Sequence, residues 1–166
     1  MDNQIAEARL IKRPAFRAVG IRWEGTFAEA GAGGIRILQE QFKKRLREIH
    51  GAVQTDVLLG LSYHAFPAAE GFVHYAAVKL GEQGSGILPE GMTGIAVPEL
   101  DYACCFHRKG QSIDLSYRNL YAWIGEQGMK ETAPEGLTHY EEYPMSQDPY
   151  DREPEFTILI PVERAL

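Results

Sequence analysis

Two stretches, Tyr63-His64-Ala65-Phe66-Pro67 and Tyr140-Glu141-Glu142-Tyr143-Pro144, have related patterns and lie 77 residues apart in the sequence. Each begins with a tyrosine, has a second aromatic residue three positions later and ends with a proline. Each also belongs to a longer segment rich in strand-forming residues, which is typical of β-structure. The pattern therefore predicts two equivalent strands in two halves of one fold.

Similar segments flank both stretches in the same order, at separations of 84 and 85 residues. The matched pairs are Phe72–Val78 with Phe156–Val162 and Phe16–Gly25 with Asp101–Gly110. The varying separation places length differences in loops, as expected for two copies of one unit. The sequence thus predicts an internal repeat of residues 10–80 and 95–163, joined by a glycine-rich linker at residues 81–94. Chance similarity between two short α+β units is the alternative.

Each half also contains one amphipathic segment in which apolar residues recur at helical spacing. These helices are expected at about residues 34–49 and 113–127, and the strands at residues 14–24, 57–66, 72–80, 95–108, 137–143 and 156–162. We expect an α+β fold of two strand-helix-strand-strand (SH2-like) units related by a pseudo-two-fold axis. Their antiparallel sheets would leave a cleft between the units, and binding sites favour such clefts.

The composition is that of an ordinary globular protein, with 45% hydrophobic and 24% charged residues among 166. One domain, residues 1–166, accounts for this length. The net charge of −6 disfavours nucleic-acid binding and mildly favours cationic ligands. No apolar stretch reaches the roughly 18 residues of a membrane span. No signal peptide is recognisable either, so we expect a cytoplasmic protein that does not bind membranes.

The cysteine and histidine patterns predict neither a metal site nor a disulfide framework. Cys104 and Cys105 are adjacent, so in a strand they point to opposite faces. The five histidines show none of the spacings of metal-binding motifs. The glycine-rich segment lacks a phosphate-binding pattern, and no serine has the surroundings of a nucleophile. We therefore expect no metal, no cofactor and no catalytic triad.

The strand at residues 137–143 provides candidate binding residues. Strand alternation places His139, Glu141 and Tyr143 on one face and Tyr140 and Glu142 on the other. The first of these faces combines aromatic rings with a carboxylate. Burial among rings disfavours the charged carboxylate, while a cation supplies a counter-charge and is attracted to ring faces. This face therefore predicts a site for a cationic aromatic molecule.

Further aromatic residues are candidates for the same cleft. The strand at residues 57–66 contributes the residues that correspond to the aromatic and acidic face of the strand at 137–143. The following strand contributes a tyrosine. The second helix contributes a tryptophan that lies about 60° from the centre of the helix's buried stripe. The complete predicted set of ligand-binding residues is Glu141, Tyr143, Trp123, Tyr63, Tyr75, His64, Phe66 and His139. Ordinary core positions for the tyrosines and the tryptophan, a surface position for His64 and a solvated Glu141 are the alternatives. We interpret the acidic loop at residues 147–153 as solvated.

The order of several motifs resembles the GyrI-like domain family over nearly the whole chain, residues 8–163. The motifs are Pro14-Ala-Phe-Arg-Ala-Val-Gly20, Gly60-Leu-Ser-Tyr63, Ala-Trp123-Ile, Tyr140-Glu141-Glu-Tyr143 and Phe156-Thr-Ile-Leu-Ile-Pro-Val162. The family includes the effector-binding domains of AraC-type regulators and of multidrug-responsive MerR-type regulators. The resemblance implies a small-molecule pocket between the two units. It also implies that Glu141 neutralises a cationic ligand, with Tyr143 beside it and Trp123 as the family's helix tryptophan.

The residues and the resemblance together predict a stand-alone module that binds cationic, amphipathic aromatic compounds, for drug binding or sequestration. No residues remain for a helix-turn-helix domain, so we expect no direct nucleic-acid binding. Two alternatives stay open, because stand-alone relatives include hydrolases of small strained electrophiles and a gyrase-interacting protein. In the first, Glu141 would polarise a water molecule, with Tyr143 or Trp123 close by. In the second, the acidic surface would contact a topoisomerase.

Overall fold

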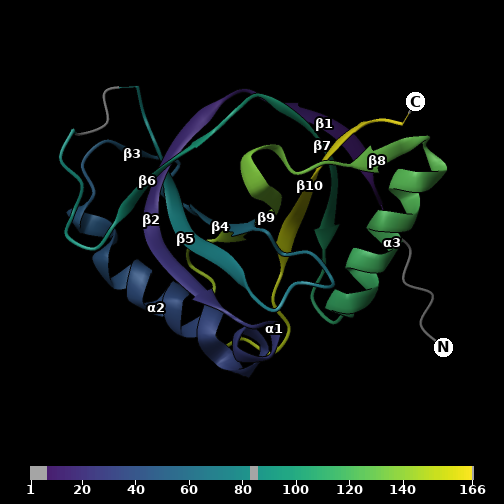
Figure 1. Cartoon of the computed structure of the whole chain (residues 1–166). Helices are drawn as coiled ribbons and strands as arrows, with labels where there is room; N and C mark the ends of the chain where they lie inside the picture. The colour runs from purple at the N-terminus through teal and green to yellow at the C-terminus, as the bar shows by residue number, and fades with distance from the viewer. Residues whose placement is uncertain (1–6, 83–85, 166) are drawn as a thin grey trace.

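Ten strands form one antiparallel sheet in the computed structural model, which describes residues 7–82 and 86–165 (Figure 1). The fold is α+β, as the sequence predicts. The strands are β1 Arg9–Arg13, β2 Phe16–Gly25, β3 Ala52–Val53, β4 Val57–Tyr63, β5 Phe72–Leu80, β6 Thr93–Val97, β7 Leu100–His107, β8 Met129–Glu131, β9 Leu137–Pro144 and β10 Phe156–Arg164. The helical segments are α1 Phe27–Glu29, η1 Ala30–Gly34, α2 Ile35–Arg45, η2 Leu46–Glu48, α3 Ile113–Glu126 and η3 Pro134–Gly136.

The strand order is symmetric about the pairing of β9 with β4. The main path runs β1-β7-β10-β9-β4-β5-β2-β6, so each half contributes three neighbouring long strands and one outer strand. This order is compatible with the predicted repeat of residues 10–80 and 95–163, which stays a prediction. The two sheets expected from the sequence are continuous, because β4 and β9 are hydrogen-bonded along their lengths.

The outer strands are exchanged between the halves. Strand β1 precedes β2 in the chain but pairs with β7, and β6 precedes β7 but pairs with β2. The sequence led us to expect one strand over residues 14–24 and one over 95–108. The first expectation misses β1, which a break at residues 14–15 separates from β2, and the second misses the break at residues 98–99 between β6 and β7. Pro14 and Pro98 stand at these breaks, where proline has no N–H group to continue a ladder.

The structure corrects the alignment of the two tyrosine-containing stretches. Tyr63 is the last residue of β4 and is paired with Leu137, whereas Tyr140 lies in the middle of β9 opposite Leu61. The strand also ends earlier than the expected residue 66, because His64 adopts a left-handed φ of 58°. Tyr63 and Tyr140 are therefore not in equivalent positions. The expected linker at residues 81–94 is shorter, since β6 begins at Thr93, and residues 83–85 lie outside the described part of the chain.

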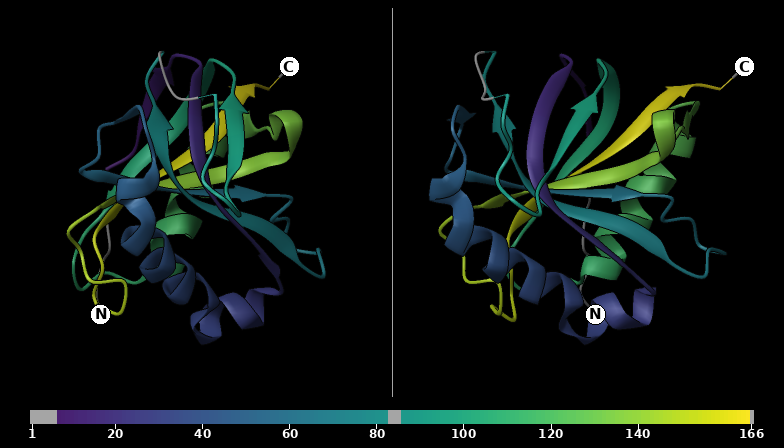
Figure 2. Two further views of the ribbon diagram at one scale, coloured as in Figure 1. Left: turned by 90° about the vertical axis from the view of Figure 1, so that its left-hand side faces the viewer. Right: turned by 60° about the vertical axis from the view of Figure 1, so that its left-hand side comes forward.

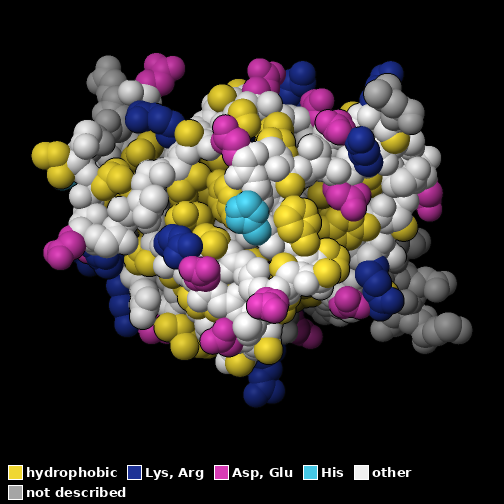
Figure 3. Space-filling model, viewed as in Figure 1, with side chains coloured by type: hydrophobic (Ala, Val, Ile, Leu, Met, Phe, Trp, Pro, Cys, Tyr) yellow, Lys and Arg dark blue, Asp and Glu magenta, His cyan; other side chains and the backbone are white. Residues whose placement is uncertain are grey.

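The helices α2 and α3 cover the same face of the sheet, one over each half. Strand alternation sends Val19, Ala76 and Val78 under α2, and Ala103, Ile158 and Ile160 under α3. The intervening residues form a third cluster on the opposite face, which includes Tyr102 and Tyr140. The views in Figure 2 show the two helices set apart beside the twisted sheet. Figure 3 shows hydrophobic side chains across the middle of one surface, with charged side chains spread around them.

The first helical run begins earlier than the periodicity predicts. Thr26 and Glu29 form a capping box, in which the Thr26 hydroxyl accepts from Glu29 N and the Glu29 carboxylate accepts from Thr26 N. Helix α1 therefore starts at Phe27, and the glycine-rich η1 joins it to α2. Apolar periodicity missed this turn because residues 30–34 are small. In the described part of the chain, no helix is long and apolar enough to cross a membrane.

A close approach at Gly20 gives a prediction for stability. A Cβ there would lie 2.1 Å from the Ala76 carbonyl oxygen and 2.7 Å from the Ala77 Cβ. Gly20→Ala should therefore force β2 away from β5 and lower the free energy of unfolding by about 2–3 kcal/mol. Chemical denaturation measures this change. Gly94→Ala in the adjacent strand is the control, since its Cβ would meet Leu88 at an ordinary 3.5 Å, and equal effects would contradict the prediction.

Candidate functional site

A cavity of about 600 Å³ lies on the helix-covered face of the sheet, between the α1–α2 segment and α3. Its floor is formed by β4, β5 and β9, and the loop at residues 145–155 closes one side. The cavity thus sits where the two halves meet, as the sequence predicts for a cleft between them. Ala30 and Gly31 belong to its wall, so the small residues of η1 leave space beside the sheet.

Glu141 stands at the centre of this floor. Strand register places it in one row with Gly60 of β4 on one side and Ile158 of β10 on the other, with Ala76 of β5 beyond Gly60. Residues paired in this way face the same side of the sheet. The carboxylate therefore has apolar neighbours along the whole row and is part-buried between the helices.

Two tyrosine hydroxyls donate hydrogen bonds to this carboxylate. Tyr143, two residues further along β9, donates to Glu141 Oε1 at 2.7 Å, and Tyr117 of α3 donates to Oε2. Burial raises the pKa of Glu141 above its usual value, and the two hydrogen bonds act in the opposite direction because they stabilise the charged form. Burial and the neighbouring carboxylate raise the pKa values of both tyrosines well above normal. Both hydroxyls therefore remain protonated donors at neutral pH.

Aromatic rings form much of the cavity wall. Phe27 and Phe72 are stacked with centroids 4.9 Å apart, and Tyr143 lies against Phe156 at 4.8 Å. Tyr117 and Tyr121 add rings from α3. Such walls offer both apolar surface and ring faces, which attract a cation by about 0.5–2 kcal/mol per ring when the site is desolvated.

The charged residues around the cavity are mostly acidic. Asp114, Asp148 and Asp151 belong to the lining together with Glu141, whereas Arg36 is the basic side chain among the described lining residues. Asp114 is paired with Arg118 on the exposed side of α3. Asp148 and Asp151 belong to the acidic loop that we interpreted as solvated, and their carboxylates accept hydrogen bonds from Tyr150 N and Glu153 N of the same loop. The residues that line the cavity thus carry more negative than positive charge.

Three of the predicted site residues come together in the cavity. His139, Glu141 and Tyr143 line it, as the alternation of β9 predicts, and His139 packs edge-on against Tyr117 at 5.4 Å. On the opposite face Tyr140 is fully buried and Glu142 pairs with Arg13 at 3.0 Å. Whether these residues bind a ligand stays a prediction.

Tyr63 and Tyr75 were expected in the cleft but lie on the opposite face of the sheet. Register pairs Ser62 with His74, so the histidine faces the cavity and the adjacent Tyr75 faces away. Tyr63 packs edge-on against Tyr75, with centroids 5.6 Å apart, beside the cluster of the opposite face. Alternation within β4 alone places Tyr63 on the face opposite Ser62, whereas the face of Tyr75 depends on the register between β4 and β5, which the sequence does not give.

The other three expected residues are also outside the cavity lining. His64 and Phe66 follow the end of β4, where strand alternation no longer applies, and both are exposed. Trp123 lies at an edge of the buried stripe of α3, as expected, but this edge is the one away from the cavity. Tyr117 and Trp123 lie about 60° on either side of Leu120, and the cavity is on the Tyr117 side. Trp123 instead borders a separate hollow beside Leu10 and Met129.

Sequence reasoning missed Tyr117, Tyr121 and the phenylalanines of the cavity. One signal was available for the tyrosines, which recur four residues apart within the apolar stripe of α3. A buried tyrosine hydroxyl needs a hydrogen-bond partner, so its position in the stripe indicates a polar group on the facing strand. Among the described residues, no group of three His, Cys, Asp or Glu side chains is arranged to hold a metal ion.

The family relationship agrees with this architecture. Residues 6–163 match the family described as the GyrI-like small molecule binding domain. Since the match covers nearly the whole chain, the protein belongs to the GyrI-like family of small-molecule-binding domains.

Comparison with individual proteins supports the same assignment. The transcriptional regulator BrlR of Pseudomonas aeruginosa is 29% identical over 157 residues, which cover 93% of this chain and 55% of that protein. The chain thus spans about half the length of this relative. The crystal structure of the EcmrR C-terminal domain is similar with a TM-score of 0.69 at 16% identity, covering 98% of this chain and all of that one. SAV2435 bound to tetraphenylphosphonium is similar with a TM-score of 0.62 at 13% identity, covering 95% and 94%.

The two adjacent glutamates of β9 give a prediction for the unliganded protein. Glu141→Gln should leave the free energy of unfolding at pH 7 equal or higher, because it removes a part-buried carboxylate that has no ion pair among the described residues. Burial raises the folded-state pKa of this group, so its stabilising contribution is present below the unfolded pKa of roughly 4.3 and is lost as the pH rises through the folded pKa. The difference in free energy of unfolding between Glu141→Gln and the wild type should therefore become smaller at acidic pH.

Glu142→Gln is the matched control on the other face of β9. It removes the charge that pairs with the part-buried Arg13, and should lower the free energy of unfolding by about 1 kcal/mol. Urea denaturation at pH 7 and pH 4 measures both variants. Destabilisation by Glu141→Gln at pH 7, of the size seen for Glu142→Gln, would contradict the predicted cost of the buried carboxylate.

Proposed function

We propose that this protein binds cationic aromatic small molecules in the cavity around Glu141. The observation that carries the proposal is one carboxylate, held by two tyrosine hydroxyls, in a floor of apolar residues and a wall of aromatic rings. A neutral apolar ligand forms no favourable electrostatic interaction with the carboxylate, and an anion is repelled by it. A cation with aromatic groups matches both the charge and the rings.

The energetics of Glu141 favour charge selection. A buried carboxylate loses hydration, and two neutral hydroxyl donors replace it only in part. A bound cation restores the missing electrostatic stabilisation within a site of low dielectric constant. The carboxylate thus destabilises the unliganded state and increases the affinity for a ligand of opposite charge. The site therefore gains selectivity in addition to affinity.

The family relationship supports the chemical class of the ligand. One structural neighbour is SAV2435 bound to tetraphenylphosphonium, which is an aromatic cation. A sequence relative, BrlR, is a transcriptional regulator of about twice the length of this chain. We propose that the domain acts through reversible binding, either to sequester such compounds or to report their presence.

A matched pair of isosteric ions tests the proposal. Tetraphenylphosphonium should bind and raise the melting temperature according to RT ln(1 + [L]/Kd), whereas tetraphenylborate should not. Glu141→Gln should weaken cation binding about ten- to a hundredfold, which corresponds to about 1.5–3 kcal/mol for a contact with a charged group. Isothermal titration calorimetry measures both effects.

Glu142→Gln is the control in this experiment, since its side chain points to the other face of β9 and pairs with Arg13. It should change cation affinity by less than about twofold. Equal binding of the two ions, or equal effects of the two glutamine variants, would refute the proposal. Recovery of chemically unchanged ligand after long incubation is expected, and formation of hydrolysis products would favour the enzymatic alternative.

Proton competition gives a further prediction. Burial raises the pKa of Glu141, and a cation binds the ionised form, so affinity should fall as the pH drops through the raised pKa of the free protein. The pKa values of His74 and His139 are lowered by burial to about 3 and about 4, so neither histidine titrates in the range from pH 5 to 8. Fluorescence titrations from neutral pH downwards measure the change. In Glu141→Gln the affinity should be independent of pH above 5, and a wild-type slope that persists in this variant would show that another group is responsible.

A further inference from the structure

A row of three polar side chains crosses the cavity floor beside Glu141. Register pairs Ser62 of β4 with His74 of β5 on one side and with His139 of β9 on the other. All three residues line the cavity. The row lies two residues away from Glu141 along the strands, which is a separation of about 7 Å. A ligand of moderate size reaches both positions.

Two ring nitrogens of this row have no hydrogen-bond partner among the described residues. They are Nε2 of His74 and Nδ1 of His139. The His74 side chain is only 3% exposed, and its Nδ1 lies 2.8 Å from the Ser62 hydroxyl, so the ring has a defined orientation. Buried polar atoms in folded proteins nearly always have partners. A polar group of a ligand in the cavity would supply the partner that these two nitrogens lack.

The chemistry of the row defines that group. Burial lowers the pKa of His74 to about 3 and that of His139 to about 4, so both rings are neutral at pH 7. A neutral imidazole has one N–H donor and one acceptor nitrogen. A hydroxyl group both donates and accepts, so it pairs with either tautomer, whereas a second cationic group gains no counter-charge from neutral rings.

Gly60 keeps the floor continuous between the two positions. A Cβ at this residue would lie 3.1 Å from Cε1 and Nε2 of His74 and 3.6 Å from Tyr143. The absent side chain therefore leaves room for the His74 ring, whose buried Nε2 lies beside Gly60. Gly60 is also the direct neighbour of Glu141 in the register, so one ligand contacts both subsites across it.

We infer that the row of His74, Ser62 and His139 is a second subsite, which selects aromatic cations that also carry a neutral hydroxyl group. This inference rests on the proposed function, because the cation is held by Glu141. It adds a specificity that charge and hydrophobicity do not supply, since a purely apolar cation leaves the two ring nitrogens without partners. Such unpartnered groups are the physical basis of discrimination against a ligand that lacks the hydroxyl.

Two phosphonium ions of similar shape test the subsite. One phenyl ring of tetraphenylphosphonium carries a para-hydroxymethyl group in the first probe and a para-ethyl group in the second. The hydroxymethyl compound should bind the wild-type protein about three- to tenfold more tightly, which is the effect of one net hydrogen bond. The ratio of the two dissociation constants is the readout, because it cancels general changes in affinity.

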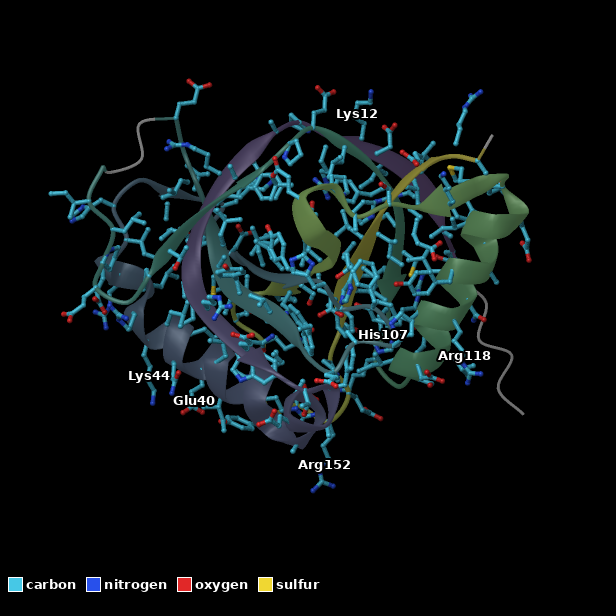
Figure 4. All side chains as sticks on the ribbon, viewed as in Figure 1. Lys12, Glu40, Lys44, His107, Arg118 and Arg152 are labelled. Carbon is cyan, nitrogen blue, oxygen red and sulfur yellow. The ribbon has the colours of Figure 1, made fainter. Side chains whose placement is uncertain are left out.

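The same substitution at two buried histidines separates the subsite from general effects of folding. His74→Phe should reduce the ratio to about one. His107→Phe should preserve it, since His107 is equally buried and pairs with a serine, Ser116, but lies outside the cavity lining at the end of β7 (Figure 4). Should His74→Phe fail to fold, the ¹⁵N signals of the His74 ring in the wild type provide the second measurement. They should shift with the hydroxymethyl probe and not with the ethyl probe.

The outcomes distinguish the inference from the proposed function. Binding of both phosphonium ions to the wild type with equal affinity overturns the subsite and leaves the proposed function intact. Failure of both ions to bind overturns the proposed function, and the subsite with it. A preference for the hydroxymethyl probe that survives in His74→Phe and is lost in His107→Phe also overturns the assignment.

Discussion

The antiparallel pairing of β4 with β9 is the constraint on which the rest of the structure depends. It joins the two halves into one sheet and sets the pairing of Gly60 with Glu141. A shift of this pairing by one residue would turn the whole helix-side row of one strand to the opposite face. The carboxylate, the tyrosine beside it and the histidine row are in the cavity because this register is fixed.

The cavity follows from how the two halves cover this central pair. Each half places its helix over its own apolar strands, so α2 and α3 leave the joining strands between them uncovered. Tyr143 packs against the cores beneath both helices and also donates to Glu141, which ties the site to the packing of the whole domain. A polar group at this position faces a space between two cores and remains accessible to a ligand.

On the opposite face of the same strands, the glutamate is paired with a charged side chain of the protein. Glu142 follows Glu141 in the chain, but it is paired with Arg13, which reaches it from the end of the exchanged strand β1. One glutamate therefore has a counter-ion from the protein, and its neighbour has two neutral donors. This difference in partners suits Glu142 to a role in stability, and it is the basis of the role in selecting a cation that we propose for Glu141.

The sequence by itself determined the class of fold, most strands, the two helices and the faces of β9, because these depend on local periodicity. The residues His139, Glu141 and Tyr143 were found in this way. The tertiary structure alone decided which side chains from other elements join them, because register and helix rotation are not local properties. Tyr75 was expected in the cavity, but the adjacent residue His74 lines it instead. Trp123 was also expected there, but Tyr117, on the other side of the same helix stripe, lines the cavity. Pro14 and Pro98 lie between each outer strand and the strand next to it in the chain, but only the pairing across the sheet shows what each outer strand contacts.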